Sequence, residues 1–251
     1  MSPTALVRHV PSTFARALAR HPQPEGIQVD RARRQHREYR RALTALGVTV
    51  HELPADERYP DCPFIEDTAI VMGEQALITC SGAESRRGEE QQVHATLSSS
   101  KKITRMEAPL TLDGGDVLRV ADVLYVGITE RTDIQAIPLL EKTFQVKVVP
   151  VQVREALHLK SFCSAPLPAI VVVAEGFLDP PPFPKSVEVL VIPREEAPAA
   201  NLVGSGESVI VHEGYPQTRR LLEERGIRCI PVDVSEFGKA DGSLTCLSLF
   251  V

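Results

Sequence analysis

The chain has 251 residues, a formal net charge of −5 with histidine neutral, 43% hydrophobic residues and 24% charged residues. This composition is typical of folded domains and excludes a disordered chain, which would have too little apolar surface to offset its conformational entropy. No run of about 18 apolar residues occurs, and no basic segment followed by an apolar one opens the chain. We therefore expect neither a membrane span nor a secretory signal.

The five cysteines include no Cys-x-x-Cys pair. An odd set of this kind fits neither a disulfide framework nor a zinc knuckle. We expect a reduced, cytoplasmic enzyme or binding protein, and the length fits either one large domain or two small ones.

Short β-rich apolar runs recur along the chain, separated by turn residues. The predicted strands are, in chain order, residues 5–10, 49–53, 68–72, 75–80, 117–120, 123–128, 146–153, 170–174, 187–192, 208–212, 227–234 and 244–251. Helical patterns cover residues 13–21, 30–46, 85–97, 131–144 and 216–225. In the longest of them Tyr39, Ala42, Leu43 and Leu46 follow helical spacing, which predicts one apolar face.

The predicted strands outnumber the helices by about two to one, and strand pairs alternate with helices roughly every 50 residues. A doubly wound α/β sheet would have one strand per helix, so this ratio favours an α/β propeller built from repeated units. The prolines at 180–184 are interpreted as a loop within the fold, because no low-complexity linker divides the chain. We predict a single domain over residues 1–251.

Two residues suited to nucleophilic or acid–base catalysis occur in the second half of the chain. Cys246 follows an Asp-Gly turn, and His158 lies between two apolar runs. A cysteine in such a place is commonly a small core residue, and a lone histidine is commonly a satisfied core or surface residue. Neither residue predicts a reaction by itself.

Acidic residues precede several predicted strands. Asp113 and Asp116 flank two glycines before the strand at 117–120, and Glu66 and Asp67 precede the apolar part of the strand at 68–72. In a propeller, carboxylates at strand starts in separate repeats would meet at one end of the axis. Turn formation alone explains the Asp-Gly sequences, but it explains two consecutive acids before an apolar strand less well.

Arginines provide a third feature. Arg86 and Arg131 each follow a predicted strand, and a solvated surface position is the simpler interpretation of both. Six further arginines lie between residues 31 and 41, on the polar side of the predicted helix. Because no aromatic residues interleave with them and the chain is acidic, we predict no nucleic-acid binding.

Six segments in order give the chain a specific resemblance. They are LPADERYPDCPFIEDTAIV, CSGAESRRGE, LDGGDVLRVADVLYVGITERTD, LHLKSFCSAPL, AAN and DGSLTCLSLF. Together they resemble the dimethylarginine dimethylaminohydrolase family over nearly the whole chain. The resemblance implies the pentein fold, a five-fold pseudosymmetric α/β propeller. It also implies a hydrolase that uses no metal or other cofactor and converts Nω-methylated arginines to citrulline and an alkylamine.

The resemblance also implies roles for individual residues. It makes Cys246 the nucleophile, His158 the general acid and base, and Asp113 the acid that orients the histidine. The implied substrate-binding residues are Leu18, Asp61, Glu66, Asp67, Arg86, Arg131 and the backbone near Ala240. Ala19 could take the place of Leu18 in the N-terminal lid, so both positions stay open.

These residue types suit the implied substrate. A carboxylate such as Asp67 can hold a planar, cationic guanidinium through charge-assisted hydrogen bonds. That cation favours the thiolate of Cys246, and His158 can protonate the departing amine. The two arginines suit the α-carboxylate of the substrate, and Asp61 suits its α-ammonium.

One departure separates the chain from arginine deiminases and amidinotransferases, which resemble this fold. Their histidine lies in a His-x-Asp motif, whereas Lys160 takes the place of that aspartate here. The lysine favours methylated arginines over arginine. Three alternatives stay open: a deiminase-type hydrolase of another guanidine or amidine, a catalytically silent pentein that serves as a binding module, and a structural zinc site at Cys246 and His158. The expected partner is a small methylated arginine, with no membrane contact, and the expected assembly is a monomer or a homodimer.

Overall fold

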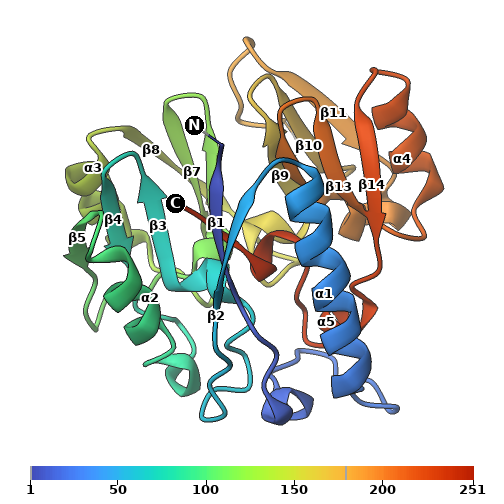
Figure 1. Ribbon diagram of the computed structural model, residues 1–251. Helices are drawn as coiled ribbons and strands as arrows, with labels where there is room; N and C mark the ends of the chain where they lie inside the picture. Colours follow the sequence, from blue (N-terminus) through green and yellow to red (C-terminus); the bar gives the residue numbers. More distant parts are fainter. Residues whose placement is uncertain (1, 179) are drawn as a thin grey trace.

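A computed structural model describes residues 2–178 and 180–251 of the chain (Figure 1). These residues form five three-stranded sheets, and the middle strand of each sheet pairs antiparallel on one side and parallel on the other. The sheets are β15–β1–β2 (Leu249–Phe250, Thr4–Arg8, Thr49–Leu53), β3–β4–β5 (Ala69–Met72, Gln75–Ile78, Lys102–Arg105), β6–β7–β8 (Val117–Val120, Val123–Ile128, Lys147–Gln152), β9–β10–β11 (Cys163–Leu167, Ile170–Ala174, Glu188–Ile192) and β12–β13–β14 (Val203–Ser205, Ser208–His212, Arg228–Val232).

The five sheets are repeats of one unit. In each unit an antiparallel strand pair leads into a crossover and then into a third strand parallel to the second, because parallel neighbours need a crossover connection. A helix lies in the crossover of four units: α1 (Val29–Ala45), α2 (Glu90–Leu97), α3 (Ile137–Phe144) and α4 (Pro216–Glu223). The described residues between β10 and β11 contain no helix, and the predicted loop at 180–184 lies there.

One strand of every sheet lines a common axial cavity of about 330 Å³. Strands β3, β6, β9, β12 and β15 contribute Val71, Leu118, Ala165, Val203 and Leu249 to its wall. Five sheets around one axis make an α/β propeller, so the predicted architecture is confirmed.

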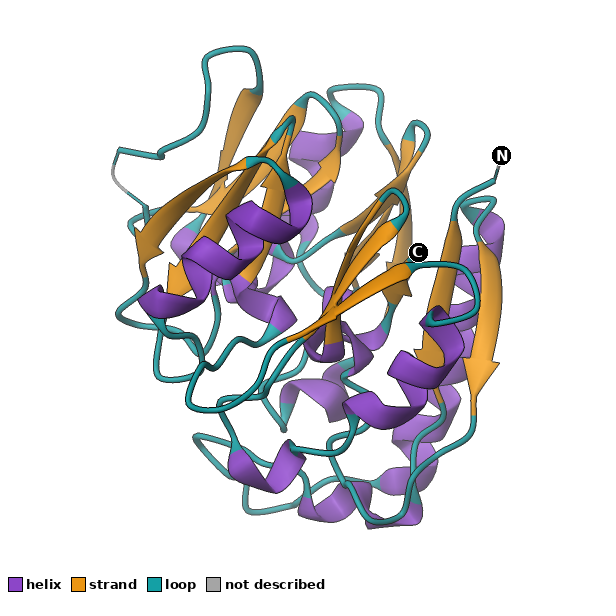
Figure 2. Ribbon diagram, turned by 90° about the vertical axis from the view of Figure 1, so that its left-hand side faces the viewer, coloured by secondary structure: helices purple, strands orange, loops and turns teal. Residues whose placement is uncertain are grey.

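The helices pack on the sheets through their apolar sides. Tyr39, Ala42, Leu43 and Leu46 are all buried along α1, which confirms the predicted apolar face. Figure 2 shows the strands running through the upper half of the view, with most of the short helical turns below them. Within residues 2–178 and 180–251, no helix has both the length and the apolar composition needed to cross a bilayer.

Two predicted elements at the ends of the chain are wrong. Residues 13–21 do not form an α-helix: a 3₁₀ helix, η1, covers Ser12–Arg16, and residues 17–28 are irregular. Pro22 disfavours the helical conformation of the residue before it, and the amides of Leu18 and Arg20 donate to distant carboxylates instead of to helical carbonyls. The predicted strand at 244–251 is reduced to Leu249–Phe250, because Thr245–Leu247 form another 3₁₀ helix, η8.

The sequence did not predict three strands, β5, β9 and β12, or the short helix α5. Strands β9 and β12 contain Pro166 and Gly204, residue types that are depleted in strands. They form because each pairs with an apolar neighbour, β10 and β13. Strand β5 is only four residues long, and the short helix α5 (Ser235–Gly238) has no apolar periodicity of its own.

Pairing of β15 with β1 closes the ring, with Leu249 opposite Leu6 and Phe250 opposite Ala5. In Figure 1 the two termini accordingly lie near each other. Leu249 is 6% exposed and packs with Leu6 and Ile65, whereas Phe250 is 36% exposed.

We expect Leu249→Ala to lower the free energy of unfolding by about 2–5 kcal/mol, because it removes buried methyl groups at the closure. Phe250→Ala, one position away at a more exposed side chain, is the matched control and should cost less. Urea denaturation measures both. Equal losses in the two variants would mean that the closure does not depend on packing of Leu249.

Candidate active site

A 3₁₀ helix precedes the inner strand of each sheet. These five turns are η2 (Ile65–Thr68), η4 (Gly114–Asp116), η6 (Leu159–Ser161), η7 (Arg194–Ala200) and η8 (Thr245–Leu247). Turn η2 contacts η4 and η8, and turn η6 contacts η4 and η7. The expectation that strand-start residues from separate repeats meet at one end of the axis is therefore confirmed.

A cavity of about 160 Å³ opens among these turns. Cys246 of η8, His158 at the start of η6 and Asp67 of η2 line it from three different repeats. The other predicted residues that line this cavity are Leu18, Asp61, Arg86, Arg131 and Ala240. Two predicted residues, Asp113 and Glu66, lie in its supporting wall.

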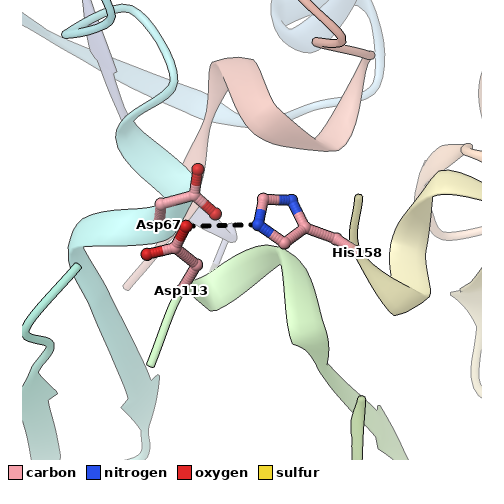
Figure 3. A group of neighbouring side chains, drawn as sticks. All are labelled: Asp67, Asp113 and His158. Atoms are coloured by element: carbon pink, nitrogen blue, oxygen red, sulfur yellow. Dashed lines mark hydrogen bonds and ion pairs between the residues drawn. The ribbon is translucent and has the colours of Figure 1, made fainter. Parts of the chain in front are cut away.

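His158 is paired with Asp113, as Figure 3 shows. The His158 Nε2 atom lies 3.2 Å from Asp113 Oδ2. Asp113 Oδ1 accepts hydrogen bonds from the Ser81 hydroxyl at 2.8 Å and the Gly82 amide at 3.1 Å. Burial alone would raise the pKa of Asp113, but the hydrogen bond with His158 and the charge of Arg86 hold it below its usual range. Asp113 is therefore an anion that orients the imidazole.

The same environment keeps a proton on His158. Burial alone would lower its pKa, but the Asp67 carboxylate and the hydrogen bond with Asp113 raise it to about 9. At neutral pH the imidazole is therefore protonated and can act as a general acid.

Gly115 allows the imidazole and Asp67 to approach the same turn. Its amide donates a hydrogen bond to Asp67 Oδ1 at 2.8 Å. A Cβ at this position would lie 2.6 Å from His158 Nδ1, so any side chain would displace the ring. Gly115, the second glycine of the Asp-Gly-Gly-Asp sequence, is therefore needed for the packing of His158 against the turn as well as for the turn itself.

Asp67 is held on its other side by Arg86. Arg86 Nη1 donates to Asp67 Oδ2 at 2.7 Å, and Arg86 Nη2 donates to Glu89 Oε2 at 2.9 Å and to the Phe64 carbonyl at 3.2 Å. Burial raises the pKa of Glu89 to about 7, although the charge of Arg86 opposes that shift. Sequence reasoning missed Glu89, and its position three residues after Arg86 was the one available signal.

Cys246 lies in η8 rather than in the predicted strand. The Ser243 amide donates to its sulfur at 3.4 Å. Burial raises the pKa of this thiol, and the carboxylates of Glu66 and Asp67 raise it further. Cys246 is therefore a thiol at neutral pH in this structure.

The segment after η1 covers the cavity as a lid. The Leu18 amide donates to Asp61 Oδ1 at 3.0 Å, and the Arg20 amide donates to Asp241 Oδ2 at 2.6 Å. Leu18 and Ala19 both line the cavity, so the choice between them stays open. Asp241 was not predicted as a site residue, although it belongs to the Asp-Gly turn before Cys246.

Glu66 faces away from this cavity. Its Oε1 accepts a hydrogen bond from Lys160 Nζ, and its Oε2 accepts one from the Thr245 hydroxyl at 2.7 Å. All three residues line the 330 Å³ axial cavity instead. The consecutive acids therefore line different cavities: Glu66 lines the axial cavity, and Asp67 lines the 160 Å³ cavity.

One group of described residues has a geometry that could hold a cation. Ligand atoms of Asp67, Asp113 and His158 lie within 4.8 Å of one another. Both Asp67 oxygens already accept hydrogen bonds, and Arg86 adds a positive charge beside them. These contacts organise the group as a hydrogen-bonded network, and metal independence stays a prediction.

The raised pKa of His158 predicts a pH-dependent stability. The imidazole has an ordinary pKa of 6.5 and a folded-state pKa of about 9, so the folded protein holds the proton more tightly. This stabilisation is complete below the ordinary pKa and is lost as the pH rises through the folded value. We expect about 3 kcal/mol from it, since one pKa unit corresponds to about 1.4 kcal/mol.

Urea denaturation on both sides of this window tests the prediction. His158→Asn should lose this part of the pH dependence. His212→Asn should keep it, because burial lowers the pKa of His212 to about 4, outside the window. The same pH dependence in all three proteins would contradict the assignment of the proton to His158.

The chain matches known proteins over most of its length. A family model described as N,N dimethylarginine dimethylhydrolase, eukaryotic, matches residues 12–179. The N(G),N(G)-dimethylarginine dimethylaminohydrolase of Pseudomonas aeruginosa is 39% identical over 225 residues, which cover 87% of this chain and 88% of that protein. The protein of the same name from Streptomyces coelicolor is 35% identical over 254 residues, which cover 99% and 96%.

Solved structures extend the comparison to the fold. A cysteine-to-serine variant of the Pseudomonas aeruginosa protein, complexed with citrulline, gives a TM-score of 0.93 at 34% identity over 100% of both chains. The product-bound N-terminal domain of ArgZ, a cyanobacterial arginine dihydrolase, gives 0.89 at 19% identity over 100% of this chain and 98% of that one, a likeness of fold alone. The chain belongs to the dimethylarginine dimethylaminohydrolase family of the pentein superfamily.

Proposed function

We propose that the protein hydrolyses Nω,Nω-dimethyl-L-arginine and Nω-methyl-L-arginine to L-citrulline, with release of dimethylamine and methylamine respectively. The observation that carries this proposal is that Cys246, His158 and Asp67 line one cavity, with Asp113 directly behind His158. The names of relatives that are 35% and 39% identical support the choice of substrate.

Substrate recognition follows from the charges around the cavity. The guanidinium is a planar cation, and Asp67 offers it a carboxylate beside Cys246. Arg86 and Arg131 provide positive charge for the α-carboxylate, and Asp61 provides negative charge for the α-ammonium. A guanidinium next to Cys246 also opposes the two carboxylates that raise the pKa of the thiol, so the substrate itself favours the reactive thiolate.

Bound substrate favours loss of the Cys246 proton, which goes to water because His158 already carries a proton. In the first half-reaction the resulting thiolate attacks the central guanidinium carbon, and a carbon–sulfur bond forms. His158 gives its proton to the methylated nitrogen, because an alkylamine leaves poorly as an anion. The carbon–nitrogen bond breaks, the neutral amine leaves, and a thiouronium remains on Cys246.

In the second half-reaction the neutral His158 takes a proton from water while the water oxygen bonds to the same carbon. The carbon–sulfur bond then breaks, Cys246 leaves as a thiolate, and the new hydroxyl gives its proton to water as the urea group of citrulline forms. Asp113 stabilises the imidazolium at both stages and does not itself accept the proton.

Lys160 supports methylated arginine over arginine as the substrate. Lys160 occupies the position of the aspartate in a His-x-Asp motif. Its ammonium donates to Glu66 on the side of the axial cavity and does not line the substrate cavity. Phe64 and Leu157 line the same cavity as Asp67 and provide apolar surface for methyl groups.

We also propose a single-domain, cytoplasmic enzyme that uses no cofactor and is a monomer or a homodimer. All five cysteines are free, which fits a reducing compartment.

Citrulline release from dimethylarginine, monomethylarginine and arginine tests the proposal. We expect kcat/KM to be highest for the two methylated substrates. Cys246→Ser should lower kcat by about a thousandfold or more, since it removes the nucleophile. Cys229→Ser, in strand β14, is the matched control and should keep normal turnover.

Two results would overturn the proposal. Faster turnover of arginine than of either methylated substrate would indicate a deiminase-type hydrolase. No turnover of any of the three, together with alkylation of Cys246 that substrate does not slow, would indicate a binding module.

A further inference from the structure

Four polar side chains form a partition between the substrate cavity and the axial cavity. They are Glu66, Lys160, Asn201 and Thr245, and we call them the axial cluster. Glu66, Lys160 and Thr245 line the axial cavity, while their neighbours in sequence, Asp67, His158 and Cys246, line the substrate cavity.

Hydrogen bonds connect every member of the axial cluster. Lys160 Nζ and the Thr245 hydroxyl donate to the two carboxylate oxygens of Glu66. The Asn201 side-chain amide donates to the Lys160 carbonyl at 2.7 Å and to the Thr245 hydroxyl at 3.0 Å, and Asn201 Oδ1 accepts from the Thr245 amide at 2.9 Å. Each side chain therefore restrains at least one other.

These contacts link the segments that hold the reacting groups. Glu66 directly precedes Asp67, Thr245 directly precedes Cys246, and Lys160 lies two residues after His158. Asn201 directly follows η7, so the turn of the fifth repeat, which places no predicted catalytic residue in the cavity, connects η6 with η8.

The ion pair between Lys160 and Glu66 lies in a cavity wall that is otherwise largely apolar. The inner strands line the same cavity with apolar side chains such as Val71, Leu118 and Val203. The side chains of Lys160 and Glu66 are only 13% and 12% exposed. Because removal of two charges from water is costly, an apolar pair would stabilise the fold at least as well. The pair therefore points to a role other than stability.

We propose that Lys160 is a positioning residue: its ammonium on Glu66, together with the Asn201 amide on its carbonyl, sets the placement of Asp67, His158 and Cys246 relative to one another. The proposal rests on the proposed function, because it assigns Lys160 a part in the same reaction. It goes beyond that function by placing a determinant of the catalytic geometry on the far side of the substrate cavity.

Electrostatics give the pair a second, measurable effect on the nucleophile. Burial raises the pKa of Cys246, Glu66 and Asp67 raise it further, and the charge of Lys160 lowers it. The other titratable or charged groups that face the cysteine line the substrate cavity or pack behind it: His158, Arg86, Arg131, Asp61, Arg20, Asp241 and Tyr39. Removal of one partner of the pair should therefore shift the thiol pKa in the direction that its charge dictates.

Steady-state kinetics of Lys160→Met test the positioning role. We expect kcat for methylarginine to fall by about tenfold to a hundredfold with little change in KM, because displaced reacting groups weaken the transition state more than substrate binding. Asn201→Ala should give a smaller loss of the same kind. Lys101→Met is the matched control, since Lys101 Nζ donates to the Gly73 carbonyl outside both cavities. It should leave kcat unchanged.

The pH profile of Cys246 alkylation by iodoacetamide, followed on the peptide that contains it, is independent of substrate turnover. Glu66→Gln should move the midpoint to lower pH. Lys160→Met should move it to higher pH, because it removes the positive charge that lowers the pKa of the thiol. Asn201→Ala and Lys101→Met carry no charge change at the cluster and should leave it in place.

The two proposals fail in different ways. If the native protein does not hydrolyse methylarginine, the proposed function fails, and the alkylation profiles still report on the cluster. If it does hydrolyse methylarginine, but Lys160→Met keeps normal kcat or Glu66→Gln and Lys160→Met do not shift the profile in opposite directions, the positioning role is wrong. A thermal melt of each variant verifies that the compared proteins are folded.

Discussion

Closure of the propeller is the constraint on which the site depends. The last strand, β15, pairs with the first, β1, and the turn that leads into β15 carries Cys246. The turns that carry Asp67 and His158 lead into inner strands of other repeats in the same way. Ring geometry thus places Cys246, near the end of the chain, against groups from the first and middle thirds.

Because the turns before the inner strands meet at one end of the axis, several charged side chains are buried close together there. Arg86 contacts Asp67 and Glu89, His158 contacts Asp113, and Lys160 contacts Glu66. Paired burial of this kind contributes little to stability, but loss of one partner leaves a buried charge without compensation. The two raised pKa values have this origin: Asp67 and Asp113 hold the proton of His158 against its burial, and burial together with Glu66 and Asp67 holds Cys246 as a thiol. A cationic substrate would reverse the second effect without removing the first.

Local patterns were enough to predict much of this arrangement. The strands at 117–120, 123–128, 170–174 and 208–212 have the expected bounds, because continuous apolar runs between turn residues mark buried strands. The meeting of acids at strand starts followed from repetition alone. The hydrogen bonds of the axial cluster could not be predicted from local patterns. Thr245 and Glu66 are 179 positions apart in the sequence, and no motif around Asn201 marks it as a partner of either. Strands β9 and β12 likewise depend on their neighbours rather than on propensity.

The central claim is that Cys246 attacks the guanidinium carbon and displaces the alkylamine. Mass spectrometry of protein quenched in acid during turnover tests it most directly. Dimethylarginine and monomethylarginine should add the same mass to the peptide that contains Cys246, because the methylated nitrogen has left each intermediate. An increment that differs between the two substrates, or a label on another residue, would contradict the account.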